Sequence, residues 1–224
     1  MKIVVLTGAG ISAESGLKTF RDGDGLWENY PVEQVASIEG WYANPKIMLQ
    51  FYNERRRQIE KAQPNKGHLL LAQLEQQHDV RIVTQNIDNL HERAGSTHVL
   101  HLHGVVTKAQ SDRDPGLISD IGYNDIHWGD KASDGAQLRP HIVWFGEAVP
   151  NIERAVHLVQ QADLLLIIGT SMVVYPAAGL VNYAPHGIPI YYIDPHPSTM
   201  QRPNLHIIQE KAGTGMDLFL QAIS

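Results

Sequence analysis

The chain has 224 residues, a formal net charge of −6 at pH 7 and no cysteine. Its length allows one substantial hydrophobic core, or a large domain with a small lobe, and its charge excludes the broad basic surface of a dedicated nucleic-acid binder. The absence of cysteine excludes disulfides, a thiol nucleophile and a thiolate metal site.

The first predicted element is a strand with the sequence KIVVLT. It lacks the length and the small-residue cleavage site of a secretory signal, and no apolar run in the chain approaches the ~18 to 20 residues of a membrane helix. We therefore expect a cytoplasmic protein with no membrane partner.

A glycine-rich turn follows this strand. The segment LTGAGISAESG places Gly8, Gly10 and Ala13 where backbone amides at a helix N-terminus can approach a pyrophosphate. The pattern is incomplete, because no second strand ends in an acid about 20 residues later. A structural strand-to-helix turn is the alternative interpretation.

Residues 31 to 77 show only helical periodicity. One helix that continues from Pro45 carries an inward stripe at steps of four, three and four: Met48, Tyr52, Arg55 and Ile59. Arg55 is unusual there, because Arg56 and Arg57 beside it can face water. Either Arg55 buries only its stem, or Tyr52 and Arg55 face a cavity that receives an anion.

Two polar segments follow the next predicted strands. The strand DVRIVT leads into VTQNIDNLHERAG, which places Gln85, Asn86 and Asp88 at the carboxyl edge where doubly wound sheets bind ligands, although Asp88 can also be a simple helix cap. HVLHLHG alternates as a strand and puts His101 and His103 on one face. Two histidines without a third ligand are a weak metal signal, whereas His103 before a glycine suits a general base, or a structural histidine.

In the second half of the chain, predicted strands alternate again with predicted helices. HIVWFG, DLLLIIGT and IPIYYID are predicted to be buried parallel strands, and NIERAVHLVQQA, YPAAGLVNYA and TGMDLFLQAI are predicted to be helices. Gly169, Thr170 and Ser171 form another strand-end turn that suits a nucleotide. The pattern predicts an α/β fold, a doubly wound parallel sheet, with a smaller lobe inserted as residues 31–77 and 107–138.

These motifs together resemble the sirtuins, the NAD-dependent protein deacylases. GAGISAESG with TFR, TQNID with HG, WFGE, and GTS with YPAAG occur in the order of that family, over nearly the whole chain. The resemblance implies a Rossmann-like NAD-binding domain from residues 1–30, 78–106 and 139–224. It also implies that an acyl group passes from a protein lysine to ADP-ribose, which gives nicotinamide and O-acyl-ADP-ribose.

The resemblance also implies roles for individual residues. His103 is the implied catalytic base. The implied NAD-binding residues are Gly8, Ala9, Gly10, Glu14, Thr19, Phe20, Arg21, Trp27, Gln85, Asn86, Ile87, Asp88, Gly169, Thr170, Ser171, Asp194 and Ala212. The implied substrate-binding residues are Tyr52, Arg55, Gly23, Trp144, Phe145, Gly146, Glu147 and Val174, with the WFGE segment pairing as an added strand with the peptide backbone.

The pair YxxR, here Tyr52 and Arg55, resembles the mark of sirtuins that prefer succinyl and malonyl groups. A guanidinium can bind a carboxylate in a bidentate fork, a tyrosine hydroxyl can add a hydrogen bond, and the small Gly23 leaves room for a longer acyl chain. We therefore expect a desuccinylase and demalonylase that also removes acetyl groups, similar to the bacterial form of this subfamily.

Two features depart from the family pattern. Most sirtuins bind a structural zinc through four cysteines, but residues 107–138 contain none; Ser111 lies about where the first is expected, and no metal is expected. Asp194 stands where relatives often have asparagine. The carboxylate of Asp194 can accept a hydrogen bond from a ribose hydroxyl and would repel a 2′-phosphate. We therefore expect the chain to use NAD and not NADP.

Two other functions remain open from the sequence. An NAD hydrolase or ADP-ribosyltransferase can use the same scaffold, but neither needs the WFGE segment or the YxxR pair. A non-catalytic NAD sensor has no need of a base at the ribose. The sequence also leaves the oligomeric state open, a monomer included.

Overall fold

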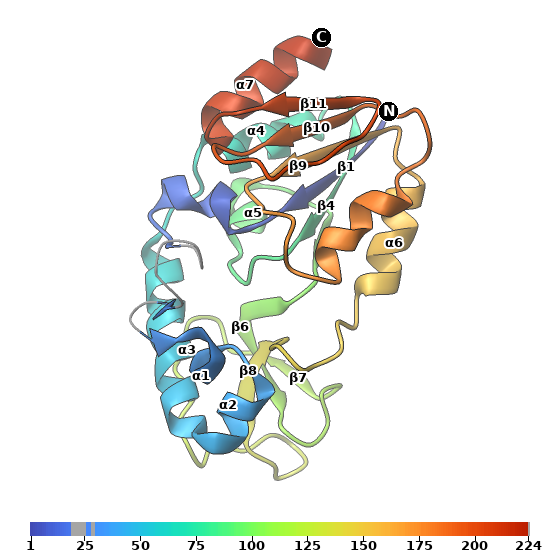
Figure 1. Cartoon of the computed structure of the whole chain (residues 1–224). Helices are drawn as coiled ribbons and strands as arrows, with labels where there is room; N and C mark the ends of the chain where they lie inside the picture. Colours follow the sequence, from blue (N-terminus) through green and yellow to red (C-terminus); the bar gives the residue numbers. More distant parts are fainter. Residues whose placement is uncertain (19–25, 28–29, 224) are drawn as a thin grey trace.

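The larger part of the protein is built on a six-stranded parallel sheet. The computed structural model describes residues 1–18, 26–27 and 30–223. The sheet order is β11-β10-β9-β1-β4-β5 (Figure 1). Its strands are β1 (Lys2–Thr7), β4 (Asp79–Thr84), β5 (Val99–His101), β9 (Leu164–Ile168), β10 (Ile190–Ile193) and β11 (Leu205–Ile208). The predicted doubly wound α/β fold is confirmed.

Helices cover both faces of this sheet, as the alternation of side chains along the central strand β1 shows. Ile3 and Val5 pack against α4 (Lys66–Leu74) and α7 (Ala212–Ile223). Val4 and Leu6 point to the other face, where α6 (Ile152–Gln160) and the 3-10 helix η3 (Ala177–Tyr183) lie. Burial on both faces explains why the central strands are almost entirely apolar.

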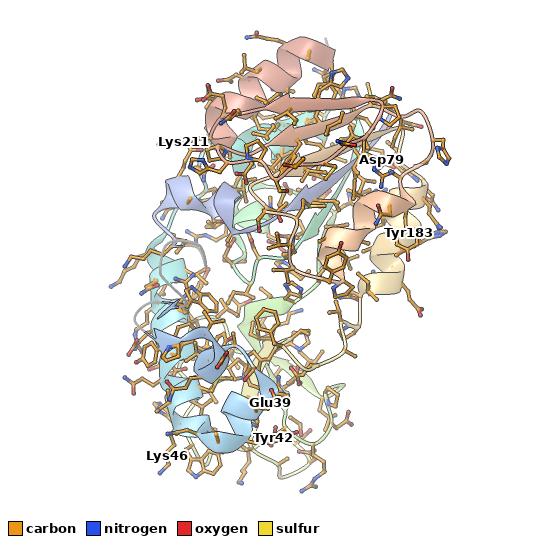
Figure 2. All side chains as sticks on the ribbon, viewed as in Figure 1. Glu39, Tyr42, Lys46, Asp79, Tyr183 and Lys211 are labelled. Atoms are coloured by element: carbon orange, nitrogen blue, oxygen red, sulfur yellow. The ribbon has the colours of Figure 1, made fainter. Side chains whose placement is uncertain are left out.

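In the described part of the chain, the smaller lobe consists of helices and a small antiparallel sheet (Figure 1). The helices are α1 (Val32–Val35), α2 (Ile38–Ala43) and α3 (Pro45–Lys61); the strands are β6 (Gly104–Ser111), β7 (Ile118–Asp120) and β8 (Leu138–Ile142), in the order β7-β6-β8. A two-stranded ribbon, β2 (Leu26–Trp27) with β3 (Tyr30–Pro31), precedes α1. Side chains such as Glu39, Tyr42 and Lys46 mark the end of the lobe farthest from the large sheet (Figure 2).

The division between the two parts differs from the expected one at two places. Helix α4 falls within residues 31–77 but packs on α7 and on α5 (Leu90–Ala94), which belong to the larger part. HIVWFG was expected to be a strand of the parallel sheet, but its first two residues end β8, which pairs antiparallel with β6. A short apolar run does not reveal which sheet it joins, and this one is buried in the lobe core through Ile142 and Trp144.

The expected inward stripe of α3 is present. Met48, Tyr52, Arg55 and Ile59 are all buried. The side chain of Asn44 accepts a hydrogen bond from the Ile47 amide, and Pro45 follows at the first helical position, so the helix starts with a cap and a residue that needs no amide partner. No helix among the described residues has the length and apolar character needed to span a membrane.

The expectation that Arg56 faces water is wrong. Arg56 is fully buried; its Nε donates to the Val106 carbonyl at 2.8 Å and its Nη1 donates to Asn53 Oδ1 at 2.7 Å. Burial lowers the pKa of Arg56 to about 10, although Asp125 opposes the shift. The hydrogen-bond partners of Arg56 are a backbone carbonyl and a side-chain amide, neither of which is charged. The sequence therefore shows no acidic partner that would indicate a buried arginine, and a surface position was expected.

Asn53 connects α3 to the lobe. Its Nδ2 donates to the Ile126 carbonyl at 2.9 Å, and its Oδ1 accepts from the Ile126 amide at 3.0 Å as well as from Arg56. One buried side chain therefore satisfies both backbone groups of Ile126 and one arm of the buried cation.

We expect Asn53→Ala to lower the free energy of unfolding by about 2 to 4 kcal/mol, because three buried polar groups lose their partner. Urea unfolding followed by circular dichroism measures this. Asn124→Ala is the matched control: Asn124 is exposed and bonds only the Ile121 carbonyl, so its loss should cost within about 0.5 kcal/mol. Equal effects of the two substitutions on the free energy of unfolding would contradict the assignment of Asn53 as the residue that connects α3 to Ile126 in the lobe.

Candidate active site

Three strand ends meet at the carboxyl edge of the parallel sheet through direct backbone contacts. Gly8 donates its amide to the Ile168 carbonyl at 3.1 Å, Gly10 donates to Gly169 at 2.8 Å, and Gly169 donates to Ile193 at 2.9 Å. A Cβ on Gly10 would lie 2.7 Å from the Gly169 carbonyl oxygen, so the loops can approach this closely only with glycine at this position. The turns after β1, β9 and β10 therefore form one continuous backbone surface.

This surface carries the residues that were expected to bind the phosphates and ribose of NAD. The 3-10 helix η1 (Ala9–Ser15) begins directly after Gly8, and no side chain caps its N-terminus. Backbone amides at a helix N-terminus are the usual ligands of a pyrophosphate. The Gly8 and Gly10 amides already donate to carbonyls of this surface, so a pyrophosphate here would use other backbone groups of the turn. Asp194, buried at the end of β10, accepts a hydrogen bond from the His196 amide through Oδ1 at 2.8 Å.

The two glycine turns are also tied to the end of β4. Gln85 Nε2 donates to Thr170 Oγ1 at 3.2 Å, and the Tyr192 hydroxyl donates to the Thr170 carbonyl at 2.7 Å. Thr170 Oγ1 also accepts from the Met172 amide, which holds the start of the 171–176 segment. The structure thus brings Gln85 together with the predicted Gly169–Ser171 turn.

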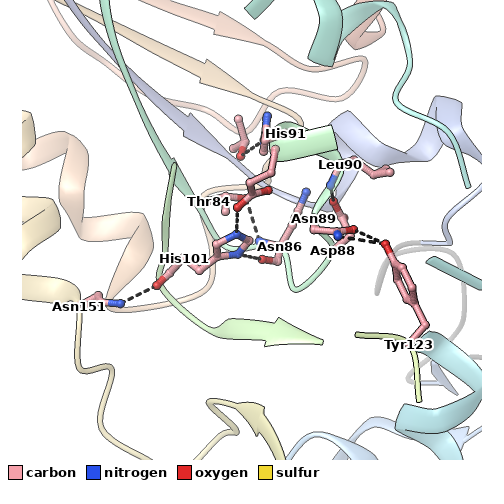
Figure 3. Close-up of polar contacts among 11 residues, drawn as sticks. Thr84, Asn86, Asp88, Asn89, Leu90, His91, His101, Tyr123 and Asn151 are labelled. Carbon is pink, nitrogen blue, oxygen red and sulfur yellow. Dashed lines mark hydrogen bonds and ion pairs between the residues drawn. The ribbon is translucent and has the colours of Figure 1, made fainter. Parts of the chain in front are cut away.

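A buried set of hydrogen bonds centred on Ser12 joins η1 to the segment after β4. Ser12 Oγ donates to Asp88 Oδ2 at 2.9 Å and accepts from Asn86 Nδ2 at 3.2 Å. Asp88 Oδ1 accepts from the amide of Leu90, the first residue of α5, although Asn89 occupies the N-cap position of this helix (Figure 3). The sequence reasoning missed Ser12, although its place inside the glycine-rich turn was a usable signal.

Two buried histidines, His68 and His91, lie behind Ser12. Their rings pack edge to face with centroids 4.9 Å apart. His68 Nδ1 accepts from the Asn65 amide, so Nε2 carries the proton and points at Ser12 Oγ 3.5 Å away. Burial lowers the pKa of His68 to about 4, opposed by Asp88, and burial together with His68 and His101 lowers that of His91. Both rings are therefore neutral at pH 7.

His103 is arranged as a general base. Its Nδ1 lies 3.1 Å from the Gln85 carbonyl, which can only accept, so Nδ1 carries the proton and Nε2 presents a lone pair. Burial lowers the pKa of His103, although this hydrogen bond opposes the shift. Gly104 follows with φ +77°, and a Cβ there would lie 2.0 Å from the His141 carbonyl, which explains the glycine after the histidine.

His101 has a different environment from His103. Its Nδ1 lies 2.9 Å from the Asn86 carbonyl and its Nε2 lies 2.7 Å from Glu92 Oε1 (Figure 3). β5 ends at His101, so the two histidines do not continue one regular strand. Both ring nitrogens of His101 are occupied, which is incompatible with a metal site formed by the two histidines.

The predicted acyl-binding residues form an aromatic cluster beneath α3. Trp144 Nε1 donates to the Tyr52 hydroxyl at 2.9 Å, and the Arg55 guanidinium lies over the Trp27 ring, 5.1 Å from its centroid. Arg55 Nη1 also donates to Gln58 Oε1 at 2.9 Å. Burial raises the pKa of Tyr52, so its hydroxyl stays protonated. Thr19, Phe20, Arg21 and Gly23, which were also predicted to be site residues, lie outside the described residues.

Arg139, which the sequence reasoning missed, holds the wall of this cluster. Its guanidinium stacks 3.6 Å from the centroid of a Trp144 ring, and it donates to both carboxylate oxygens of Glu147 at 2.8 and 2.9 Å. Glu147 Oε2 also accepts from the Trp144 amide. The Glu147 carboxylate is therefore hydrogen-bonded within the chain.

The WFGE segment is a turn and not a regular strand. Glu147 donates its amide to the Trp144 carbonyl at 3.0 Å. Phe145 already exchanges backbone hydrogen bonds with Ala36 and Ile38, while its side chain is 51 % exposed. Any added peptide strand must use the remaining edge of this turn.

The other predicted site residues lie in separate segments of the chain. Glu14 Oε2 accepts from the Gly213 amide at 2.9 Å, which brings it next to Ala212 at the start of α7. The Ile87 carbonyl accepts from the Val106 amide at 2.8 Å, and Val174 is half-buried in the segment before η3. Asn89 and Tyr123 bond each other at 3.0 Å, which fastens the segment after β4 to the lobe (Figure 3).

Hydrogen bonds hold the cysteine-free segment of the lobe. Ser111 Oγ donates to Asp134 Oδ2 at 2.7 Å and accepts from the amides of Arg113 and Asp114. These contacts close the turn in which the first cysteine was expected. Over residues 1–18, 26–27 and 30–223, no group of three His, Cys, Asp or Glu side chains is arranged to hold a metal ion.

Comparisons with known proteins agree on one family. The family model described as "Sir2 family" matches residues 8–176. The chain is 53% identical over 227 residues to an NAD-dependent protein deacylase of Bacteroides thetaiotaomicron, covering 99% of this chain and 97% of that one. It is 54% identical over 211 residues to a deacylase of the same name from Helicobacter pylori, covering 94% and 92%.

Solved structures give the same answer. A Sir2 homologue in complex with NAD superposes with a TM-score of 0.88 at 36% identity, covering 99% of this chain and 89% of that one. A mutant Sir2 homologue in complex with ADP-ribose gives a TM-score of 0.90 at 37% identity, covering 99% and 91%.

The buried His68 predicts an acid-sensitive fold. The unfolded chain binds a proton at this ring near pH 6.5 and the native chain only near pH 4, so the stabilisation is complete above pH 6.5 and is lost as the pH falls toward 4. His68→Gln should remove about 1.4 kcal/mol per pH unit from the slope of unfolding free energy in this range. His157→Gln, at an exposed ring of α6, should leave the slope unchanged; the same slope in all three proteins would contradict the prediction.

Proposed function

The chain belongs to the Sir2 family, and we propose that within it the protein is a desuccinylase and demalonylase that also removes acetyl groups from lysine side chains. The chain matches relatives named NAD-dependent protein deacylase over nearly their full length, and NAD-dependent protein deacylation is the activity of this chain. The proposal concerns which acyl groups are removed and which residues recognise them.

One observation carries the acyl assignment: a cation and a phenol share the inward face of α3. Arg55 is 5 % exposed and Tyr52 1 % exposed, and the two lie one helical turn apart beside Trp144 and Trp27. In such a low-dielectric setting a guanidinium attracts a carboxylate more strongly than in water. A succinyl or malonyl group ends in a carboxylate, whereas an acetyl group does not.

The hydroxyl of Tyr52 suits the same role. It accepts a hydrogen bond from Trp144 Nε1, and its own proton is free to donate to an acyl carboxylate. Because burial raises the pKa of Tyr52, the phenol is neutral and adds no negative charge that would repel an acidic acyl group.

We also propose roles for the NAD-binding edge. NAD supplies an electrophilic ribose carbon that receives the acyl oxygen and releases nicotinamide. The backbone of Gly8 to Gly10 is proposed to bind the pyrophosphate, Gly169 to Ser171 and Asp194 the adenosine half, and Asn86 and Asp88 the nicotinamide half. His103 Nε2 is proposed to accept the proton from a ribose hydroxyl, since Nδ1 is held by Gln85.

The substrate is an acylated lysine of a protein. We propose that its peptide lies along Trp144 to Glu147 and Val174, with exposed Phe145 against it, and that the lobe keeps its shape without a metal. The Ser111–Asp134 hydrogen bond and the burial of Ile126 support this last point.

The acyl assignment is tested by Arg55→Met. We expect kcat/KM for desuccinylation to fall about 10- to 100-fold, because a charge-assisted hydrogen bond contributes about 1.5 to 3 kcal/mol, while deacetylation changes by less than about threefold. The measurement compares succinyl, malonyl and acetyl forms of one peptide with NAD, by mass spectrometry.

Arg57→Met is the matched control, because Arg57 is exposed on the same helix and pairs with Asp125. It should leave all three rates unchanged. Equal losses on succinyl and acetyl peptides in Arg55→Met would reject Arg55 as the acyl reader. Nicotinamide release that does not depend on acyl peptide would indicate an NAD hydrolase instead.

His103→Ala should lower deacylation about 10²- to 10⁴-fold while the circular dichroism spectrum stays unchanged. In the wild-type enzyme the acidic limb of kcat/KM should lie below pH 6.5, because the pKa of His103 is lowered and the ring is already a base at neutral pH. His98→Ala, at an exposed ring, serves as control. Substantial turnover by His103→Ala would remove this residue from the mechanism.

A further inference from the structure

Two consecutive carbonyls after β4 are each held by an imidazole. The Gln85 carbonyl accepts from His103 Nδ1 at 3.1 Å. The Asn86 carbonyl lies 2.9 Å from His101 Nδ1 (Figure 3). The mechanism proposed above uses His103 and gives no role to His101. Yet His101 contacts the backbone of Asn86, the residue assigned to the nicotinamide half of NAD.

The hydrogen-bond partners of His101 determine its charge. A backbone carbonyl can only accept, and so can the carboxylate of Glu92, whose Oε1 lies 2.7 Å from Nε2. Both ring nitrogens must therefore carry a proton. A neutral imidazole has a single N–H, so the observed geometry requires the imidazolium.

The surroundings of the ring favour this charge. Glu92 on α5 and Asp88 before it are the nearby acids, and they outweigh the cost of burial, so that the pKa of His101 is raised. The other titratable groups that face it are His91 on α5 and His141 on β8, whose pKa values are both lowered. Lys108 on β6 acts on Glu92 and His141. The positive charge of this group of histidines therefore lies on His101.

Asn86 is fixed at three points, one of which is this ring. Its amide donates to Thr84 Oγ1 at 3.0 Å, its side-chain Nδ2 donates to Ser12 Oγ at 3.2 Å, and its carbonyl accepts from His101. Loss of one proton from His101 would leave either Glu92 or the Asn86 carbonyl opposite a lone pair. The contact that fixes the orientation of the Asn86 backbone then becomes repulsive.

We propose that His101, bound to Glu92, is a positioning residue of the deacylation reaction: as an imidazolium it holds Asn86 in place for the nicotinamide half of NAD. This inference rests on the proposed function, in which Asn86 contacts NAD. Deprotonation of His101 releases Asn86, so the bridge contributes an alkaline limb to the pH profile, separate from the acidic limb that His103 produces.

The test is the variant Glu92→Gln, which keeps the shape of the side chain and removes its charge. At pH 8 we expect kcat/KM for NAD to fall about tenfold, while KM for the acyl peptide changes less than about twofold. The alkaline limb of kcat/KM for NAD should move to lower pH, a change that a merely structural role would not cause. Glu92→Asp, which restores the charge, should recover most of the loss.

Glu75→Gln is the matched control. Glu75 is also a partly exposed carboxylate that accepts hydrogen bonds, from the amide and hydroxyl of Thr97, but it lies away from the proposed site. Its kinetics and pH profile should equal those of the wild type. A Glu92→Gln profile that superposes on the wild-type profile would overturn the inference, whereas absence of NAD-dependent deacylation in the wild type would instead overturn the proposed function.

A second measurement does not depend on the folding of a variant. Carbon-13 NMR titration of histidine-labelled wild-type enzyme with NAD bound should show that the pKa of His101 is higher than that of a free histidine and the pKa of His103 is lower, with the His101 signal assigned through His101→Asn. A His101 pKa at or below that of free histidine would overturn the inference, even if Glu92→Gln failed to fold.

Discussion

The architecture of the site depends on the close approach of two backbones at the carboxyl edge of the sheet. The Gly10 amide and the Gly169 carbonyl are 2.8 Å apart, a distance that a side chain on either residue would prevent. Because β1 and β9 are neighbouring parallel strands, their turns come off the sheet side by side, and glycine lets them meet. The proposed cofactor surface is therefore made largely of main chain, whose position is fixed by the sheet itself.

The polar side chains of the site are organised on this backbone surface by burial. Ser12, Asn86 and Asp88 satisfy one another, and His68 and His91 remain neutral because they are enclosed. His101 and His103 have different hydrogen-bond partners, although only one residue separates them in the chain. His101 is hydrogen-bonded to a carboxylate as well as to a carbonyl, whereas His103 is hydrogen-bonded to a carbonyl. In the proposed mechanism the carboxylate keeps His101 protonated, and its absence leaves His103 a neutral base.

The sequence was sufficient to predict the parallel sheet, the glycine turns and the inward stripe of α3, because each depends on local periodicity or on a steric demand for glycine. It was insufficient where contacts join distant segments. Ser12 and His68 are 56 positions apart, and no local pattern connects them. The small antiparallel sheet was missed because β7 is short and polar, because β6 shows no clear alternation, and because the end of β8 resembles a core strand of the large sheet.

One strand of that small sheet has a consequence for substrate choice. Arg139 lies in β8, donates hydrogen bonds to Glu147 and stacks on the Trp144 ring. The position of Trp144 beside Tyr52 therefore depends on the pairing of β8 with β6. A slip of this pairing by one residue would turn Arg139 to the opposite side of the sheet. The proposed discrimination among acyl groups therefore depends on strand alignment in the lobe, and substitutions in β6 or β8 can change it without contacting the acyl group.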